Sequence, residues 1–456
     1  MRITPEIKVT LKELCATLDC PCTRDTKTVI TAITTDSRLA ENGDIFIPLK
    51  GERVDGRAFI GEAKKKGALI LSDVEKSDIF VKDIERALCN IVSLYLRKAD
   101  KLKHRIALTG SVGKSTTKEF LFRILSVKYK VHKTKENQNN LLGVFYTAIS
   151  VTRESEIFLA ELGMNHKGEI KMLSEAISPD VSLITNIGNA HIGNLGSREE
   201  IANAKLEILC GMKEGGLIVP HGEKLLDKKE VASTFSSTDM RADVFINKRK
   251  NKKGTIDVVT PHRYINSIPF SVIGDHNLEN LAAAIAVADL LRFKNGEIVK
   301  GVKSITEDLL RARIINLKGF KIYDDTYSSS PEAMKAVLEM IAKSYDKKSC
   351  LIGDMLELGD KSPLFHKEIG RIAAKLGYNR IYTYGIYGAY VAAGALEWGM
   401  NKERIHICNS TGIQKCVNDI IKYHDEGEII VFKGSHKMHL EYIYQELIKK
   451  TEKLND

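Results

Sequence analysis

The sequence is poor in aromatic residues, and none of them is interleaved with its basic runs. Aromatic side chains make up 7% of the 456 residues, and tryptophan occurs once. The net charge is +10, but the basic runs at residues 64–66 and 248–253 contain no aromatic residue on which a nucleic-acid base could stack. We therefore expect no nucleic-acid partner, and the charge favours a general attraction for polyanionic small molecules.

Long apolar runs, an export signal and paired cysteine motifs are also missing. The longest apolar stretch, residues 281–291, is interrupted by Asp289, so no membrane span is expected. The N-terminal segment alternates charged with apolar side chains and has no small-residue cleavage site. The eight cysteines are scattered, and Cys20 and Cys22 are separated by one residue, where metal and redox motifs usually have two. These features predict a cytoplasmic protein with reduced thiols.

The length is sufficient for about three domains of ordinary size. Residues 1–103 mix short strand and helix patterns, which predicts a small α/β domain. Residues 104–312 alternate apolar strands with helical patterns, as a largely parallel sheet requires. Residues 313–456 repeat this alternation without a glycine fingerprint, which predicts a Rossmann-like, doubly wound domain and an α/β fold class throughout. The strands expected in the central domain are 106–109, 157–161, 181–187 and 216–220.

A glycine-rich segment at residues 107–120, ALTGSVGKSTTKEF, lies between a strand pattern and a helix pattern. Its glycines let backbone N–H groups converge on an anion, while the helix N-terminus and a lysine add positive charge. A hydroxyl after the lysine can bind magnesium. The full nucleotide-binding pattern has glycine where Leu108 stands, so a glycine turn that caps an ordinary helix is an alternative at this point. The phosphate-binding candidates are Gly110, Ser111, Gly113, Lys114, Ser115 and Thr116.

Three further polar residues are expected at the same edge of the central sheet. Glu161 ends one strand pattern, and Asn186 and His191 follow the next. The carboxyl ends of parallel strands face one ligand crevice, so a carboxylate and an imidazole are expected beside the phosphate loop, where they could bind magnesium. A structural histidine is the alternative for His191 considered alone.

Amide and carboxylate groups near two later helix patterns are candidate nucleoside contacts. Asn277 and Asn280 begin an alanine-rich helix pattern and could read adenine edges, or Asn277 could cap the helix. Asp324 and Asp325 end a strand pattern, and we expect them in a turn where a ribose could be held. Capping by Ser328–Ser330 is the competing explanation. No nucleophile elbow, cysteine–histidine signature or zinc spacing is found, which favours phosphoryl chemistry.

Eight motifs together resemble those of the Mur ligase family in order and approximate spacing. They are TGSVGKSTTKE, NQNN, ELGMNHKGEI, TNIGNAHIGNLGSREEIANAKLEI, GDHNLENLAAA, DDTY, GDMLELG and KGS. TDSR and GDIFIPLKGERVDG extend the resemblance over the first domain, so it covers nearly the whole chain. It implies an ATP-dependent amide ligase, in which a substrate carboxylate attacks the γ-phosphate and an amine then displaces phosphate from the acyl phosphate. The resemblance is strongest to members that join D-alanyl-D-alanine to UDP-N-acetylmuramoyl-tripeptide in peptidoglycan precursor synthesis.

The resemblance also implies two Mg²⁺ ions. Ser115 and Glu161 would hold the first ion and His191 the second. Lys205 matches the family's carbamylated lysine, in which CO₂ converts the amine into a carboxylate that supports the second metal.

A catalytic arginine on the third domain is a further implication of the resemblance. Arg313 would contact the γ-phosphate, so the site would be complete only after that domain closes onto the central one. For ATP, the resemblance implies contacts of Lys114 with the β- and γ-phosphates, of Asn277 and Asn280 with adenine, and of Asp325 with the ribose. For the uridine nucleotide, it implies contacts with Thr35, Asp36, Ser37 and Arg38. The residues implied to contact the substrates are Asn139, Asn140 and Ser435.

Departures from the family pattern leave the amine substrate open. Ser328–Ser330 stand where the relevant members have Asn-Ala-Asn, and His436 replaces an arginine near where the amino substrate would dock. A related ligase that adds a different amino acid or dipeptide to a nucleotide-linked acid is therefore the second hypothesis. A nucleotide-binding regulatory protein would lose Glu161, His191 or Lys205, and all three are present. No coiled coil or apolar seam is evident, so we expect a monomer with small-molecule substrates and no membrane or nucleic-acid partner.

Overall fold

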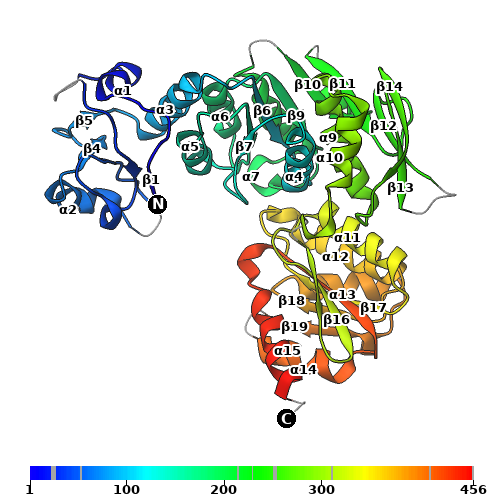
Figure 1. Cartoon of the computed structure of the whole chain (residues 1–456). Helices are drawn as coiled ribbons and strands as arrows, with labels where there is room; N and C mark the ends of the chain where they lie inside the picture. The colour runs from blue at the N-terminus through cyan, green and yellow to red at the C-terminus, as the bar shows by residue number, and fades with distance from the viewer. Residues whose placement is uncertain are drawn as a thin grey trace.

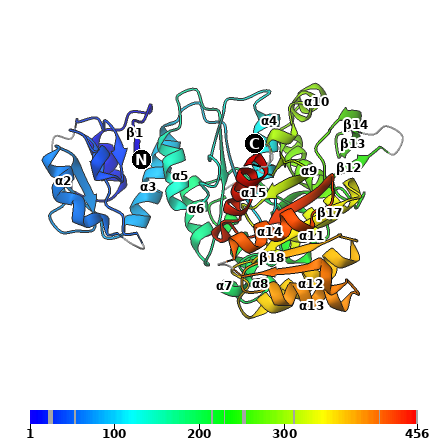
Figure 2. The same cartoon turned by 90° about the horizontal axis from the view of Figure 1, so that it is seen from below.

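The chain folds into three α/β units, each built around a sheet of its own (Figure 1). The computed structural model describes residues 1–21, 27–51, 54–212, 215–227, 230–249, 254–309, 312–409 and 412–453. The first unit, in blue, lies to one side of the central unit, and the third, in yellow to red, lies below it. Figure 2 shows in a second view that the first unit lies at one end of the molecule, next to the central unit. The predicted three-domain α/β fold is confirmed.

The first unit contains a five-stranded sheet in the order β1-β2-β3-β4-β5, in which only the β1–β2 pair is antiparallel among the described strands. Helix α3 is amphipathic, and it packs both against α1 of this unit and against two helices of the central unit. Helix α1 begins with a capping box, in which Thr10 and Glu13 each accept a hydrogen bond from the other's backbone N–H. The elements are β1 (Arg2–Ile3), α1 (Leu11–Thr17), β2 (Ile33–Thr34), β3 (Ile45–Phe46), α2 (Ile60–Lys65), β4 (Leu69–Ser72), β5 (Ile79–Phe80) and α3 (Ile84–Lys98).

The central unit contains a nine-stranded sheet in the order β14-β13-β12-β11-β10-β9-β6-β8-β7. The described neighbours from β7 to β12 are parallel, and β13 and β14 add an antiparallel edge. The elements are β6 (His104–Thr109), α4 (Lys114–Leu125), β7 (Val131–Lys133), α5 (Leu141–Ile149), β8 (Ile157–Glu161), α6 (Glu169–Ile177), β9 (Val181–Ile184), α7 (Ile192–Leu195), α8 (Arg198–Leu206), β10 (Gly216–Pro220), β11 (Val231–Ser236), β12 (Val244–Lys248), β13 (Thr255–Thr260), β14 (Arg263–Pro269), α9 (Asp275–Leu290) and α10 (Asn295–Lys303).

Helix α9 is buried along most of its length, which explains its alanine-rich sequence. It packs against α4 and the sheet, and small side chains let these elements approach closely. Its one buried acid, Asp289, is satisfied by Arg263, whose Nε lies 3.1 Å from Oδ1, and by the Thr260 hydroxyl at 3.0 Å. This packing holds α4, and with it the phosphate loop, against the sheet.

The third unit is a six-stranded sheet in the order β15-β16-β20-β17-β18-β19, parallel in the described strands except for the β15–β16 pair. Successive residues of β17 enter different apolar clusters: Cys350 and Ile352 join one, and Leu351 joins another. Both faces are therefore covered by helices, as the doubly wound prediction requires. The elements are β15 (Arg313–Asn316), β16 (Phe320–Asp325), α11 (Pro331–Ser344), β17 (Lys348–Gly353), α12 (Ser362–Lys375), β18 (Ile381–Tyr384), α13 (Gly388–Glu397), β19 (Ile405–Cys408), α14 (Ile413–Tyr423), β20 (Glu428–Lys433) and α15 (Glu441–Lys453).

The expected strand positions in the central unit hold with small differences. The strand expected at 181–187 ends at Ile184, because the chain then turns to brace the phosphate loop. Strand β6 begins at His104 and β15 at Arg313, although the domain boundaries 103/104 and 312/313 stay predictions. In the described part of the chain, every helix is too short or too polar to cross a bilayer.

Candidate active site

The phosphate loop leaves the end of β6 and enters α4 through two glycines with positive φ. Gly110 has φ 152° and Gly113 has φ 82°. A Cβ atom at Gly110 would lie 1.8 Å from the Thr185 hydroxyl, and one at Gly113 would lie 2.3 Å from the Asn280 side-chain oxygen. Both positions therefore require glycine for conformation and for space. A turn that only caps a helix needs one such glycine, whereas this loop has two, each packed against a side chain from a different part of the central unit.

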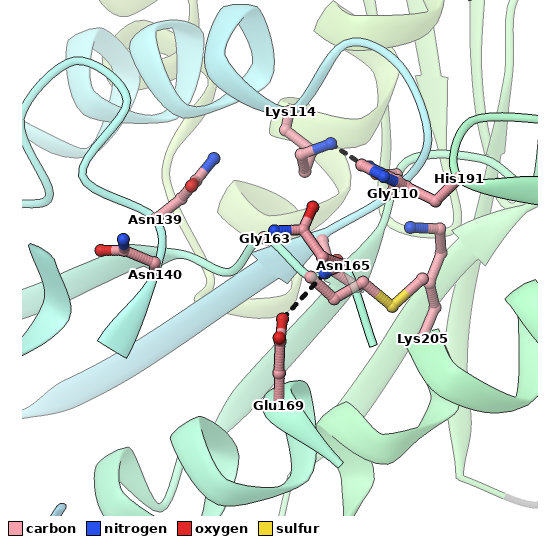
Figure 3. Close-up of a pocket in the computed structure, with 11 residues that line it drawn as sticks. Gly110, Lys114, Asn139, Asn140, Gly163, Asn165, Glu169, His191 and Lys205 are labelled. Atoms are coloured by element: carbon pink, nitrogen blue, oxygen red, sulfur yellow. Dashed lines mark hydrogen bonds between the residues drawn. The ribbon is translucent and has the colours of Figure 1, made fainter. Parts of the chain in front are cut away.

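The loop is braced from the end of β9. The backbone N–H of Val112 donates to Oδ1 of Asn186 at 2.9 Å, and Nδ2 of Asn186 donates back to the Val112 carbonyl at 2.9 Å. The Thr185 hydroxyl donates to the same carbonyl at 2.6 Å. Lys114 folds over the loop, and its Nζ donates to the Gly110 carbonyl at 2.7 Å (Figure 3). A lysine ammonium and a helix N-terminus thus converge where an anion can bind.

Glu161 lies at the end of β8 with its carboxylate beside α4. Its carboxylate accepts hydrogen bonds from the Ser115 hydroxyl at 2.9 Å and from Nδ2 of Asn139 at 2.9 Å. Burial opposes ionisation of this carboxyl, but the charges of Lys118 and Lys114 outweigh it and hold its pKa below the ordinary value. An ionised carboxylate next to a hydroxyl is the hard oxygen ligand set that Mg²⁺ prefers, so these residues fit the first metal.

Lys118 is part of this site, and sequence reasoning missed it. Its side chain is 1% exposed, its Nζ lies 3.0 Å from Oε2 of Glu161, and it donates to the Glu136 carbonyl at 2.8 Å. The only available signal is its position four residues after Lys114, one helical turn further along α4. Lys118 therefore joins the Glu161 carboxylate to the chain segment that leads to Asn139.

A cavity of about 150 Å³ opens beside the phosphate loop. In Figure 3, Asn139 and Asn140 lie on one side of it and His191 and Lys205 on the other. It is lined by Thr109, Gly110, Lys114, Asn139, Asn140, Gly163, Met164, Asn165, Glu169, His191 and Lys205. The cavity thus brings together Lys114, Asn139, Asn140, His191 and Lys205, which are far apart in the sequence, as the resemblance implied.

Lys205 and His191 have unusual environments within this cavity. Lys205 lies on α8 with 2% exposure, and burial, aided by the nearby Lys114 charge, holds the pKa of its amine well below the ordinary value. A lowered pKa favours the unprotonated form of the amine, which is the nucleophilic form. His191 precedes α7, and its Nδ1 lies 2.5 Å from Oε2 of Glu357 in the third unit. Glu357 is a second residue that sequence reasoning missed.

A larger cleft of about 760 Å³ lies between the central and third units. Arg313 lines it from β15, with its Nε 3.1 Å from Oδ2 of Asp324 and its NH2 donating to the Tyr444 hydroxyl at 2.8 Å. Ser115 and Thr116 line the opposite wall, so Arg313 and the phosphate loop face one cleft, as expected. The other lining residues are Glu119, Lys133, Lys135, Glu136, Leu309, Thr326, Tyr327, His436 and Glu441.

Asn277 and Asn280 are engaged within the fold. Nδ2 of Asn277 donates to the Ile273 carbonyl at 2.6 Å, and Oδ1 of Asn280 accepts from the Thr117 hydroxyl at 3.2 Å. Both side chains are buried, and neither residue lines the two cavities described above. Gly274, not Asn277, precedes the first residue of α9, so the capping alternative for Asn277 is wrong. Their contact with adenine stays a prediction.

Asp325 lies in β16, which corrects the expectation of a turn. The strand continues through Asp325 because it pairs with β20 up to Lys433, and Lys433 Nζ lies 2.8 Å from Oδ2 of Asp325. Burial lowers the pKa of His276 at the start of α9, and the charge of Asp325 opposes this shift. The start of α9 and the end of β16 therefore face each other across the two units. Ser330 caps α11 by accepting from the Ala333 N–H, as the capping alternative proposed.

The TDSR segment lies outside both cavities. Asp36 pairs with Arg38 at 2.7 Å, and the Ser37 hydroxyl donates to Glu62 at 2.8 Å. The Thr35 hydroxyl contacts the hydroxyl of Tyr146 on α5, so this segment lies where the first and central units meet. In the third unit, the Ser435 hydroxyl accepts from the Leu356 N–H at 2.9 Å. Uridine and substrate contacts of these residues stay predictions.

A phosphate loop with an ionised carboxylate on one side and a buried lysine in the adjoining cavity defines a three-domain, phosphate-loop nucleotide enzyme. Residues 108–288 match the Mur ligase middle domain, residues 310–436 the glutamate ligase domain of Mur ligases, and residues 29–94 the Mur ligase family catalytic domain. The chain belongs to the Mur ligase family.

Individual relatives extend this likeness over the whole chain. The UDP-N-acetylmuramoyl-tripeptide–D-alanyl-D-alanine ligase of Bacillus subtilis (strain 168) is 35% identical over 437 residues, which cover 93% of this chain and 94% of that protein. The crystal structure of MurF from Acinetobacter baumannii superposes with a TM-score of 0.87 at 30% identity, covering 98% of this chain and 100% of that chain. The structure of MurF ligase from Thermotoga maritima in complex with ADP superposes with a TM-score of 0.78 at 27% identity, covering 92% of this chain and 98% of that chain.

Proposed function

We propose that this protein is an ATP-dependent ligase that joins D-alanyl-D-alanine to UDP-N-acetylmuramoyl-tripeptide in peptidoglycan precursor synthesis. The observation that carries the proposal is the full-length likeness to the Bacillus subtilis ligase of that activity. The assembled site supports it, because Lys114, Glu161, His191 and Lys205 lie around one phosphate loop. The protein would act in the cytoplasm as a monomer and contribute to the cell wall, cell shape and division.

The reaction needs charge stabilisation more than a protein nucleophile. The tripeptide carboxylate oxygen forms a bond to the γ-phosphorus while the bond to ADP breaks, and the dipeptide amine then attacks the acyl carbon, releasing phosphate and a proton. Lys114 and the loop N–H groups would hold the β- and γ-phosphates. Ser115 and Glu161 would hold Mg²⁺, which when bound neutralises charge on phosphate oxygens. Arg313 would contact the γ-phosphate from the facing wall of the cleft.

Nucleotide and substrate contacts follow the same scheme. Asn277 and Asn280 would reach adenine after a rearrangement of their present hydrogen bonds, and Asp325 would hold the ribose. Asn139 and Asn140 line the smaller cavity and would meet the acid substrate there. The remaining proposed contacts are Thr35, Asp36, Ser37 and Arg38 with the uridine nucleotide and Ser435 with the amino substrate.

Carbamylation of Lys205 belongs to this proposal. A buried, neutral amine can add to CO₂ to form a carbamate, whereas an ordinary protonated lysine cannot. The carbamate would support a metal held by His191, which lines the same cavity. The donors present, an imidazole and a new carboxylate-like group, fit a second divalent ion.

Replacement of Lys205 by alanine should reduce ligation by roughly 10²–10³-fold, in line with loss of one electrostatic group at a reaction centre. Phosphate release from ATP with both substrates is the measurement. Added acetate or another small carboxylate should restore part of the activity, because it can occupy the position of the carbamate. Full activity of Lys205→Ala without any carboxylate would contradict the assignment.

The function itself is tested by phosphate release from ATP and Mg²⁺ with UDP-N-acetylmuramoyl-tripeptide, with and without D-alanyl-D-alanine. Release that needs both substrates, together with a product of the summed mass less water, is the expected result. Protein that binds ATP but shows no dipeptide-dependent release would rule the proposal out.

A second candidate is a ligase for another amino acid or dipeptide. The supporting observation is that Tyr327 and His436, whose ring centroids are 5.4 Å apart, line the cleft together with Arg313. Family members with arginine in place of His436 would present a fixed charge at this point. A panel of amines in the same assay separates the candidates, because the correct amine should give the highest kcat/KM.

A further inference from the structure

Glu357 reaches from the third unit to the histidine proposed for the second metal. It lies in the GDMLELG loop that follows β17, and its Oε2 lies 2.5 Å from Nδ1 of His191. This Nδ1 is buried and makes no aligned hydrogen bond to the described residues. The Glu357 carboxylate therefore lies against this nitrogen and can accept a hydrogen bond from it after a small adjustment of angle. The proposed reaction gives this carboxylate no role.

The two loops that meet here have unusual backbones. His191 has φ 64° and Glu357 has φ 65°, a region that favours glycine. The Gly193 N–H donates to the Glu357 carbonyl at 2.9 Å, and a Cβ at Gly193 would lie 2.5 Å from the backbone nitrogen of Gly359. Side chains keep a positive φ only where surrounding contacts hold them, and such residues gather at functional sites. The loops are therefore shaped to bring this carboxylate to this imidazole.

A histidine that binds a metal usually donates its other ring N–H to a carboxylate, which fixes its tautomer and orientation. We propose that Glu357 is a positioning residue for His191: it accepts from Nδ1–H and leaves Nε2 as the nitrogen available to the metal. Because Glu357 belongs to the third unit and His191 to the central one, the histidine is oriented only while the two units are docked. This inference rests on the proposed function, in which His191 holds the second Mg²⁺.

The first test measures the tautomer of His191 in the protein without metal or substrates. Selective ¹⁵N labelling of histidine, with the signals assigned through a His191→Gln variant, should show Nδ1–H in the wild type. Glu357→Ala should shift His191 towards Nε2–H, and Glu357→Gln, which keeps an oxygen acceptor, should retain Nδ1–H. An unchanged tautomer in Glu357→Ala would overturn the proposal, whichever amine the enzyme uses.

Lys343→Ala is the matched control, because it removes a different contact between the same two units. Lys343 Nζ lies 2.7 Å from Oδ2 of Asp275, is 69% exposed, and is remote from both cavity linings. This variant should keep the tautomer and the activity of the wild type. If Lys343→Ala shifted the tautomer as much as Glu357→Ala does, the effect would come from loss of contact between the two units and not from the carboxylate. That result would overturn the positioning role of Glu357.

The second test uses kinetics and metal binding. Glu357→Ala should lower kcat by roughly 10–100-fold and weaken binding of a second Mn²⁺ in the presence of ADP, as loss of such a carboxylate does elsewhere. The KM for ATP should change little, and Glu357→Gln should recover most of the kcat. Equal losses in the Ala and Gln variants would contradict the proposal. Absence of dipeptide-dependent turnover in the wild type would refute the proposed function and leave the tautomer result valid.

Discussion

Replacing Lys118 by methionine should lower the free energy of unfolding by about 3–5 kcal/mol, because it leaves the buried Glu161 carboxylate without its ammonium partner. Both side chains are 1% exposed, so water cannot replace the lost charge. The same change removes the hydrogen bond to the Glu136 carbonyl and should loosen the segment that carries Asn139. Chemical denaturation with two independent probes measures the effect.

A second substitution separates charge from packing. Adding Glu161→Gln to Lys118→Met removes the unpaired charge, so the double variant should regain much of the lost stability while remaining inactive. Lys335→Met is the matched control, since Lys335 is an exposed lysine that lies 3.9 Å from Glu339 on one helix, and its loss should cost less than about 1 kcal/mol. Equal stability of Lys118→Met and Lys335→Met would show that the buried pair contributes nothing.

Gly110→Ala should strongly weaken productive ATP binding. The new methyl group would occupy the position of the Thr185 hydroxyl, 1.8 Å away, at a φ of 152° that alanine avoids. Thr185 would have to move and give up its hydrogen bond to Val112, which displaces the loop. We expect kcat/KM for ATP to decrease on the order of 10²-fold, because a displaced loop would hold the phosphates out of the reactive position. The free energy of unfolding should fall by about 1–3 kcal/mol, because alanine is strained at this φ.

Gly61→Ala is the control for this prediction. Gly61 lies in α2, has no atom within 4 Å of an added Cβ, and is far from the cavities. Alanine is favoured over glycine in a helix, so this variant should be slightly more stable and fully active. Gly110→Ala with wild-type ATP affinity, measured by titration calorimetry, would mean that the loop does not bind the phosphates.

Local patterns predicted the elements that depend on neighbours in sequence. The GSVGKST spacing predicted a strand, a loop and a helix, and the loop has the two positive-φ glycines that such a turn needs. Apolar runs predicted the strands that carry Glu161 and the following polar segments. Because parallel strands end at one edge, the grouping of Glu161 and His191 with the phosphate loop followed from order along the chain, whereas Lys205 was assigned to the site only through the family resemblance.

Predictions failed where contacts distant in the sequence decide the outcome. Asp325 was expected in a turn, but pairing with β20 keeps it in a strand. Lys118 was not among the predicted site residues, because only the packing of α4 against β8 buries it with Glu161. Glu357 lies in the GDMLELG motif, but the sequence assigned it no role because its partner His191 belongs to another unit.

The sequence by itself determined the fold class, the phosphate loop and the membership in a ligase family, because these depend on local spacing and on motif order. The tertiary structure decided which charges are buried together. It neutralises Glu161 with Lys118, lowers the pKa of the Lys205 amine by burial, and brings Glu357 to His191 across two units. Desolvation and contact across a domain boundary arise only when distant segments pack, so a one-dimensional pattern does not contain them.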